Sequence, residues 1–197
     1  MRGRGIAVRK LASFLMVTLD GYFEGDEPWQ IEWHNVDEEF NEFAIKQLDA
    51  SDILIFGRAT YIGMAQYWPT EEAAKDDQEV ASRMNSMPKI VVSRTLDEPA
   101  PAWSNTRLVK DVNQLRELKA ESGKDMLVLG SSVLTTSLIE GKLLDELRII
   151  VNPLILGKGH ALSGTAAKRM PLRLLDVRRF DHGNVLLTYE PEKSQAE

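Results

Sequence analysis

Short apolar runs are separated by longer amphipathic segments along most of the chain. The clearest runs cover residues 11–17, 53–56, 90–92 and 126–129, and they are nearly continuous in Val, Ile, Leu, Met and Phe. Such runs are typical of strands that are covered on both faces, because a strand with one solvent-exposed face alternates apolar and polar positions. We therefore predict that these four segments are central strands of one sheet.

The segments between the runs have the spacing of helices. Asn35 can cap a helix because Glu38 follows three residues later, and apolar residues then recur on one face. A second helix is predicted over residues 71–87, where a proline stops it. Two further helices are predicted over residues 112–122 and 133–140, each followed by a glycine.

The last third of the chain has a different pattern. Residues 172–180 and 185–189 are apolar-rich segments, and the turn-forming residues 181–184 separate them. With the segment 147–151 they predict three more strands, of which the last two form an antiparallel hairpin. The order of elements indicates an α/β fold with helices on both faces of a sheet that begins parallel and ends antiparallel.

Length and composition limit the class of protein. The 197 residues suit one domain, which we place at residues 10–190, with flexible arms at 1–9 and 191–197. Hydrophobic residues make up 43% of the chain and charged residues 27%, which is an ordinary globular composition. No apolar run reaches the ~18 residues of a membrane-spanning helix. We expect a cytoplasmic protein without membrane contact.

The chain has no cysteine and a net charge of −6. The first fact excludes disulfides, cysteine-ligated metals and thiol nucleophiles. The second argues against a nucleic-acid partner, because a phosphate backbone attracts a basic surface. His34 and Glu38 have a spacing that metal ligands can adopt, but no further ligands cluster with them, so we predict no metal site.

Residues that can bind a ligand follow two of the predicted central strands. Gly57, Arg58 and Thr60 come after the second run, and Ser93 and Arg94 come after the third. Open α/β sheets bind ligands at the carboxyl ends of their strands. A glycine lets the backbone approach a phosphate, an arginine supplies a fork of donors, and Thr60 can cap the next helix. The alternative interpretation of each arginine is a solvated side chain in an ordinary turn.

A third turn of this kind follows the fourth run. Gly130, Ser131, Ser132 and Val133 form a glycine turn that opens directly into a helix. Because a helix N-terminus has unpaired N–H groups and a positive dipole end, this turn can hold a pyrophosphate. A serine at this position is also an ordinary N-cap. The occurrence of three such turns after separate buried strands favours an anionic cofactor.

Three longer stretches resemble the dihydrofolate reductase-like superfamily. Residues 53–61 (ILIFGRATY) are similar to its strand-to-helix turn. Residues 10–25 and 126–159 are similar to the first strand, the glycine turn and the Pro-x-x-Leu-Gly-x-Gly loop of the riboflavin biosynthesis reductase branch, the RibD C-terminal type. The resemblance implies a three-layer dihydrofolate reductase-like fold with a mixed, mostly parallel sheet.

The resemblance also implies NADPH as the cofactor. Arg58, Ser93 and Arg94 match the residues that hold the 2′-phosphate of the adenosine, and Gly57 and Thr60 belong to the same motif. The turn 130–133 matches the part of the family's site that holds the pyrophosphate.

The nicotinamide is expected beside the first strand, near Ala12, Ser13 and Thr18. Hydride transfer also needs a proton, which a carboxylate after this strand supplies in dihydrofolate reductases.

The resemblance makes Asp37 the first candidate for the proton donor, Glu39 the second and Asp20 the third. Acidic residues in a first helical turn also complement the helix dipole, and Asp20 can simply form a turn.

Three tryptophans are candidates for contact with the substrate. Trp29, Trp33 and Trp68 lie in or near the loops that should cover the substrate pocket. A planar heterocycle can stack on such rings, although aromatic residues in loops more often extend the core.

These observations predict an NADPH-dependent reductase that transfers a hydride to a C=N or C=O carbon of a small heterocycle. The resemblance points to 5-amino-6-(5-phosphoribosylamino)uracil reductase. Leu129 and Ser131 depart from the glutamate and second glycine of that branch, so two alternatives stay open: a dihydrofolate reductase and an NADPH-binding protein without turnover. The resemblance also implies a homodimer, for which the late apolar strands can supply the interface.

Overall fold

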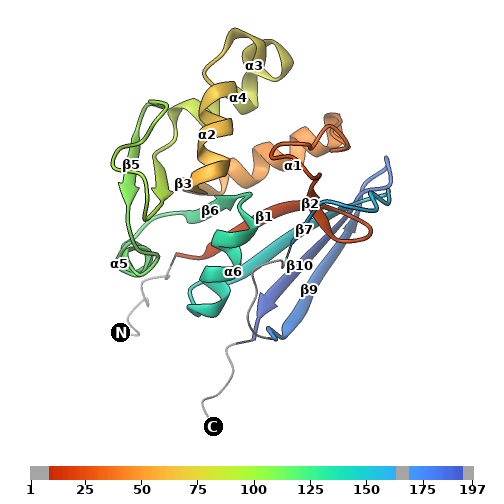
Figure 1. The fold of residues 1–197 in the computed structure, drawn as a ribbon. Helices are drawn as coiled ribbons and strands as arrows, with labels where there is room; N and C mark the ends of the chain where they lie inside the picture. Colours follow the sequence, from red (N-terminus) through yellow and green to blue (C-terminus); the bar gives the residue numbers. More distant parts are fainter. Residues whose placement is uncertain (1–8, 163–168, 193–197) are drawn as a thin grey trace, which may run out of the picture.

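The computed structural model describes residues 9–162 and 169–192. Its strands are β1 (Leu11–Thr18), β2 (Tyr22–Glu24), β3 (Ser51–Gly57), β4 (Lys89–Val92), β5 (Thr106–Val109), β6 (Asp125–Leu129), β7 (Glu146–Asn152), β8 (His160–Ala161), β9 (Leu172–Arg179) and β10 (Val185–Pro191). Eight of them form one sheet in the order β5-β4-β3-β6-β1-β7-β10-β9, and β2 pairs with β8 (Figure 1).

The direction of the strands changes near one end of the sheet. Neighbouring strands from β5 to β7 are parallel, whereas β10 is antiparallel to β7 and to β9. The predicted α/β fold with a C-terminal antiparallel hairpin is confirmed. The carboxyl ends of the parallel strands lie at one edge of the sheet, which we call the carboxyl edge, and their starts lie at the opposite, amino edge.

Helices cover both faces of the sheet. They are α1 (Glu38–Asp49), α2 (Arg58–Tyr67), α3 (Glu71–Asp76), α4 (Gln78–Ser86), α5 (Gln114–Ala120) and α6 (Ser132–Glu140). One face carries α1, α2 and α4, and the other carries α5 and α6 (Figure 1). No helix in the described ranges is both long enough and apolar enough to cross a bilayer.

Each face of the sheet has its own core. Leu15 of β1 and Leu138 of α6 belong to the cluster under α5 and α6. Phe56 of β3 and Tyr61 of α2 belong to the cluster on the other face, with ring centroids 6.4 Å apart. Because the central strands bury both faces, their sequences are apolar at successive positions instead of alternating.

The cap of α1 differs from the prediction. Asp37, not Asn35, is the N-cap, and its Oδ1 accepts a hydrogen bond from the Phe40 N–H at 2.8 Å. Asn35 instead donates from Nδ2 to the His182 carbonyl at 3.0 Å. Both residue types cap helices well, and the contact with the β9–β10 turn decides between them.

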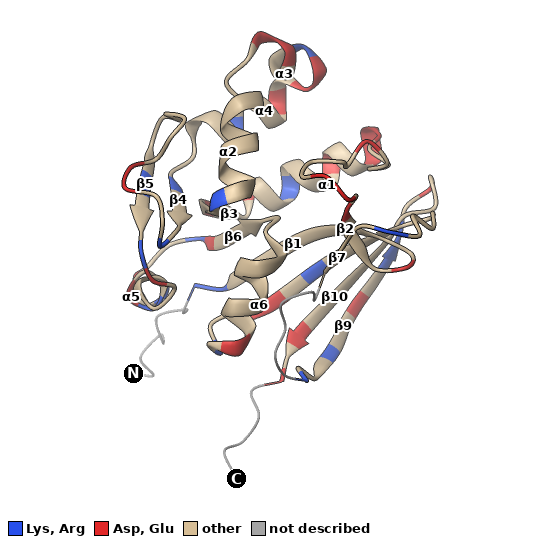
Figure 2. Cartoon of the chain, in the orientation of Figure 1, with Lys and Arg blue, Asp and Glu red and all other residues tan. Residues whose placement is uncertain are grey.

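The helix predicted over residues 71–87 is two helices. Asp77 is extended, with φ −153°, and its Oδ1 accepts from the Val80 N–H at 2.9 Å, so it ends α3 and caps α4. Asp favours this local bond over a helix interior, which explains the break. The resulting α3 segment is strongly acidic (Figure 2).

The two shortest strands and the ordered structure of the residues near the chain ends were not predicted from the sequence. β2 and β8 have three and two residues, too few for a periodic pattern. Most of the predicted arms 1–9 and 191–197 lies outside the described residues. Arg9, however, is buried and donates from Nε to the Lys124 carbonyl at 2.7 Å, and Pro191 is the last residue of β10.

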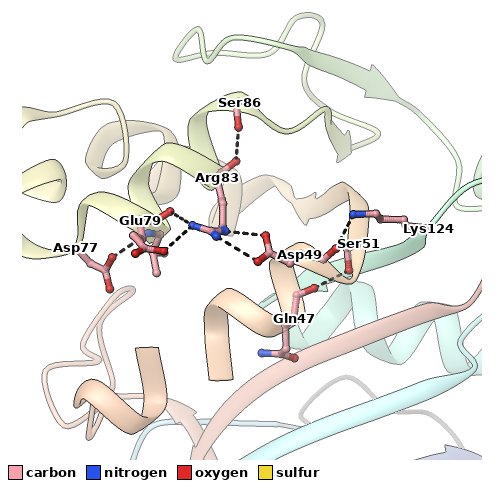
Figure 3. A network of polar contacts seen from close by, with 9 residues as sticks. Gln47, Asp49, Ser51, Asp77, Glu79, Arg83, Ser86 and Lys124 are labelled. Atoms are coloured by element: carbon pink, nitrogen blue, oxygen red, sulfur yellow. Dashed lines mark hydrogen bonds and ion pairs between the residues drawn. The ribbon is translucent and has the colours of Figure 1, made fainter. Parts of the chain in front are cut away.

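Polar contacts at the amino edge join α4 to α1 and to the sheet (Figure 3). Arg83 of α4 donates from Nε and Nη2 to the two carboxylate oxygens of Asp49, at 2.8 and 3.2 Å. Lys124 donates from Nζ to the Asp49 carbonyl at 2.8 Å, and the Ser51 hydroxyl donates to the Gln47 carbonyl at 3.0 Å. The end of α1 and the starts of β3 and β6 are thereby held together.

Candidate cofactor and active site

The turn between β3 and α2 leaves the start of a helix uncapped. Gly57 occupies the N-cap position without a side-chain hydrogen bond, so α2 begins at Arg58. Thr60 therefore does not cap the helix as predicted; it is buried in the first turn. The first N–H groups of α2 have no intrahelical acceptor and can serve a ligand.

Arg58 lies against the turn that follows β4. Its Nη1 donates to the Thr95 hydroxyl at 3.0 Å. Ser93 is buried, and its Oγ accepts from the N–H groups of Thr95 and Leu96 at 3.3 and 3.1 Å, so this hydroxyl shapes the turn. Arg94 is exposed beside it. Sequence reasoning missed Thr95, although a second hydroxyl two residues after Ser93 is a recognisable turn feature.

The turn between β6 and α6 contains two consecutive residues of left-handed conformation. Gly130 has φ +62° and Ser131 has φ +57°. The Ser131 side chain accepts from the Leu134 N–H at 3.3 Å and caps α6. Ser132 and Val133 are the first two residues of the helix, where N–H groups have no intrahelical acceptor. The predicted glycine turn into a helix is present.

These turns meet at the carboxyl edge. A Cβ added to Gly57 would lie 2.2 Å from the Ser131 Oγ, so the two turns touch and only glycine fits there. A Cβ added to Gly130 would lie 3.0 Å from the Thr60 Cγ2. With the bond from Arg58 to Thr95, the turns after β3, β4 and β6 form one continuous surface. It carries two helix N-termini and two guanidinium groups, a combination suited to phosphate.

The predicted residues of β1 lie beside this surface but have buried side chains. Ala12 and Ser13 are almost fully buried, and the Ser13 hydroxyl is 2.6 Å from that of Thr135 in α6. The Thr18 hydroxyl donates to Asp20 at 2.6 Å and accepts from the Tyr22 N–H at 3.0 Å. Both hydroxyl groups are therefore already paired within the protein.

Asp20 organises the loop after β1. Its Oδ1 also accepts from the Leu156 N–H at 3.1 Å, and its Oδ2 accepts from the Gly157 N–H at 2.8 Å. The hydrogen bond from Thr18, followed by these backbone bonds, lowers the pKa of Asp20 below its usual value. A carboxylate held in this way is a poor proton donor near neutral pH, so the contacts favour a structural role.

Asp37 and Glu39 tie the start of α1 to the β9–β10 hairpin. Besides capping the helix, Asp37 pairs through Oδ2 with Nδ1 of His182. Glu39 accepts from the Asp181 N–H at 2.9 Å and pairs with Arg178 at 2.7 Å. The backbone bond from Asp181, with Arg178 next, lowers the pKa of Glu39. These contacts disfavour Glu39 as the acid, because a carboxylate that is already paired is a poor proton donor.

The three tryptophans have different surroundings. Trp29 has φ +70°, is 38% exposed, and packs so closely on α2 that a Cβ on Gly63 would lie 2.0 Å from its ring. The Trp33 Nε1 donates to the Gln30 carbonyl at 3.0 Å. Trp68 packs against the α2-side core and donates from Nε1 to the Met64 Sδ at 3.0 Å. Trp68 therefore packs against the core on the α2 side of the sheet, whereas Trp29 lies at the surface.

His34, which the sequence offered only as a metal ligand with Glu38, has a partly buried ring. The ring stands edge-on to Trp33, with centroids 4.6 Å apart, and its Nε2 is buried without a hydrogen-bond partner among the described residues. Burial lowers the pKa of His34 from 6.5 to about 4. The next residue, Asn35, donates its N–H to the Asn152 side chain at the end of β7, so His34 lies at the carboxyl edge. A lone histidine carries no pattern that reveals such burial.

Comparison with known proteins identifies the family. The family model of the RibD C-terminal domain matches residues 9–186. The chain belongs to this family. The resemblance predicted from the sequence is thereby confirmed, and the matched residues include all three turns of the carboxyl edge.

Relatives of this RibD C-terminal domain cover almost its full length. The uncharacterized protein YyaP of Bacillus subtilis (strain 168) is 31% identical over 185 residues, which is 92% of this chain and 94% of YyaP. A protein of Shewanella sp. PV-4, described provisionally as a riboflavin biosynthesis protein, has a TM-score of 0.69 at 22% identity and covers 93% of this chain and 99% of its own.

The fold also extends to a dihydrofolate reductase. The enzyme from Enterococcus faecalis, solved as a complex with NADP(H) and RAB-propyl, has a TM-score of 0.60 at 15% identity. The match covers 93% of this chain and 97% of that enzyme. At this identity the likeness shows the shared fold, which is the predicted dihydrofolate reductase-like one.

Proposed function

We propose that this RibD C-terminal domain is an NADPH-dependent reductase of a small heterocyclic substrate. The observation that carries the proposal is the meeting of three strand-end turns, where the uncapped start of α2 touches the start of α6 through Gly57 and Ser131. Family membership and the NADP(H) complex of a protein with the same fold support this cofactor.

The residues at the carboxyl edge fit a phosphorylated dinucleotide. Glycine at position 57 lets the turn after β3 approach the turn after β6, since a side chain there would strike Ser131. The N–H groups of Ser132 and Val133, at the N-terminus of α6, suit the pyrophosphate. Arg58 and Arg94 suit a ribose 2′-phosphate, because guanidinium groups bind phosphate in a bidentate manner.

Within this proposal the chain supplies binding, orientation and a proton. NADPH, when bound, supplies the hydride that reduces a C=N or C=O carbon. The turns at the carboxyl edge fix the two phosphate groups and thereby the position of the nicotinamide relative to β1. Asp37 stays our candidate for the proton donor, and its Oδ2 contacts Nδ1 of the exposed imidazole of His182. Trp29 and Trp33 are our candidates for stacking against the heterocycle.

Binding measurements test the cofactor. We expect NADPH to quench tryptophan fluorescence at lower concentration than NADH, because only NADPH has the 2′-phosphate. An absence of binding by either dinucleotide would contradict the proposal.

Turnover measurements then separate the candidate activities. Loss of dihydronicotinamide absorbance with the ribosylaminopyrimidine supports the uracil reductase, and loss with dihydrofolate supports the dihydrofolate reductase, whose fold this chain shares. NADPH binding without oxidation in the presence of either compound would indicate a binding protein without turnover.

A further inference from the structure

The segment that joins β1 to α1, residues 19–37, crosses the carboxyl edge of the sheet. The Trp29 ring packs against Gly63 of α2, the helix that follows β3. Further along the segment, Asn35 donates its N–H to the Asn152 side chain at the end of β7. Because β6 and β1 lie between β3 and β7 in the sheet, the segment passes over the end of β1, where our proposal places the nicotinamide. We call residues 19–37 the covering segment.

The covering segment is acidic and contains no lysine or arginine (Figure 2). Its carboxylates are those of Asp20, Glu24, Asp26, Glu27, Glu32 and Asp37. Its one histidine, His34, is neutral at pH 7, because burial lowers its pKa to about 4. The covering segment therefore brings negative charge and no positive charge to this part of the carboxyl edge.

Two bases in and just before β8 contact the covering segment, and both are paired with its acids. Lys158 forms an ion pair with Asp26. The Nδ1 of His160 lies 2.9 Å from the Oε1 of Glu24. The Oε2 of Glu24 accepts from the Trp29 N–H at 3.0 Å, so both oxygens of this carboxylate are engaged.

Two bases of the β9–β10 hairpin are paired in the same way with the start of α1. Arg178 pairs with Glu39 at 2.7 Å, and His182 pairs with Asp37. Arg179 lies on the opposite face of β9 from Arg178, because successive side chains of a strand alternate between the two faces. An acid of this chain therefore already occupies each of the four bases Lys158, His160, Arg178 and His182.

Two parts of the carboxyl edge consequently differ in what they can bind. Beside the turns after β3 and β4, Arg58 donates to the neutral hydroxyl of Thr95, and a phosphate can replace that hydroxyl without leaving a charge unpaired. Beside the covering segment, a phosphate has to displace a carboxylate from its base and then lie next to that carboxylate. Like charges placed together disfavour binding, and binding sites reject a wrong ligand in this way.

We infer that the substrate of the proposed reductase has no phosphate or carboxylate arm and is an uncharged or cationic heterocycle. The inference rests on the proposed function, because it takes the substrate to lie beside Asp37 and the covering segment. Within it, Glu24, Asp26 and Glu39 determine specificity, since they occupy bases that would otherwise attract an anion.

Two matched pairs of compounds test the inference on the full chain saturated with NADPH. The first pair is 5-amino-6-ribosylaminouracil and its 5′-phosphate, and the second is 6-methyldihydropterin and dihydrofolate. Only the second member of each pair has an anionic arm. We expect calorimetric titration to show that the member without this arm binds about tenfold or more tightly, and kcat/KM for NADPH oxidation should follow the same order.

The outcomes separate this inference from the proposed function. Equal or tighter binding of the anionic member in either pair would overturn the inference, and so would failure of all four compounds to bind. Binding of NADPH is measured first and by itself, and its absence would contradict the proposed reductase.

Variants that release one base at a time test the cause of the preference. Asp26→Asn frees Lys158 and Glu39→Gln frees Arg178, so each variant should reduce the preference about threefold. Both acids are at least partly exposed, and both variants should therefore fold, which circular dichroism checks. An unchanged preference in both variants would overturn the assignment of specificity to these ion pairs.

Glu190→Gln is the matched control for these variants. It frees Arg173, which lies at the start of β9 and therefore at the amino edge. The preference for compounds without an anionic arm should be the same in this variant as in the wild type. A reduction as large as that in Asp26→Asn or Glu39→Gln would overturn the assignment, because any released base would then have the same effect.

Discussion

The two edges of the sheet satisfy their polar groups in opposite ways. At the amino edge, Arg83 is held by both carboxylate oxygens of Asp49, and the buried Arg9 pairs with Asp52. At the carboxyl edge, the Thr95 hydroxyl is the one hydrogen-bond partner of the Arg58 side chain among the described residues, and α2 starts without a side-chain cap. Donors at the amino edge are used for the fold, and donors at the carboxyl edge remain available to a ligand.

The difference shows that the polar groups that stabilise this sheet and those that can bind a ligand lie at opposite edges. A bidentate ion pair fixes where a helix ends, but it leaves its guanidinium little capacity for a phosphate. A glycine turn and an uncapped helix start cost some stability, and they keep N–H groups free. The Nε2 of His34 is buried without a hydrogen-bond partner in the described part of the chain, which is a further unfavourable feature of the carboxyl edge.

The largest effect is expected from the pH dependence of unfolding. The unfolded chain protonates His34 near pH 6.5, whereas the folded chain resists protonation until about 4. The free energy of unfolding should therefore be fully retained above pH 6.5 and fall as the pH drops toward 4, by about 3 kcal/mol in total. Urea unfolding of wild type and His34→Gln at several pH values measures it. Parallel curves for the two proteins would contradict the assignment to His34.

Gly57→Ala should disrupt the contact between the two turns. The added Cβ would lie 2.2 Å from the Ser131 Oγ, and overpacking of this kind costs about 1–3 kcal/mol. NADPH affinity should fall with stability, as calorimetric titration and thermal melting would show. The double variant Gly57→Ala/Ser131→Gly removes the obstructing side chain at a left-handed position, so it should recover part of both losses. No recovery would mean that the contact is not the cause.

Arg58→Ala should weaken NADPH binding about tenfold or more and leave NADH nearly unchanged, since charge-assisted bonds to the 2′-phosphate are lost. Dissociation constants for the two cofactors measure the effect. Arg83→Ala at the amino edge is the matched control and should change neither constant. Equal losses for NADPH and NADH would place Arg58 outside a 2′-phosphate site.

Thr95→Val should reduce the preference for NADPH about fivefold, because the loss of one hydrogen bond releases the Arg58 guanidinium from its orientation. The ratio of the NADPH and NADH dissociation constants reports this positioning role. Thr95→Ser keeps the hydroxyl and should retain the wild-type ratio. An unchanged ratio in the valine variant would show that Arg58 is oriented without Thr95.

The smallest effect is expected at the amino edge. Arg83→Gln should lower Tm slightly, because a surface-exposed pair between Arg83 and Asp49 is screened by water. High salt should lower the Tm of the wild type toward that of the variant. A change in NADPH affinity in this variant would contradict the separation between the two edges.

Much of the fold follows from the sequence because its cause is local. Nearly continuous apolar runs predicted β1, β3, β4 and β6, since a strand covered on both faces has few polar positions. The turn formers at residues 181–184 predicted the hairpin of β9 and β10. The glycine turn at Gly130 was likewise visible, because a left-handed turn before a helix favours glycine.

Other features depend on residues distant in the chain. Asp37 and not Asn35 caps α1, because the Asn35 side chain donates to the carbonyl of His182, a residue distant in the chain. The hydrogen bond between Arg58 and Thr95 exists because the tertiary structure places the turn after β4 beside Arg58. The acids predicted as proton donors were found in turns and ion pairs, whose partners no spacing along the chain specifies.

The sequence by itself determined the central strands, the C-terminal hairpin and the residue types at the end of each strand, because periodicity and turn chemistry act over a few neighbouring residues. Only the tertiary structure decided which of those strand ends share one surface and which carboxylates are already paired. These outcomes depend on strand order and on packing between distant segments, and neither is encoded in any single stretch of the chain.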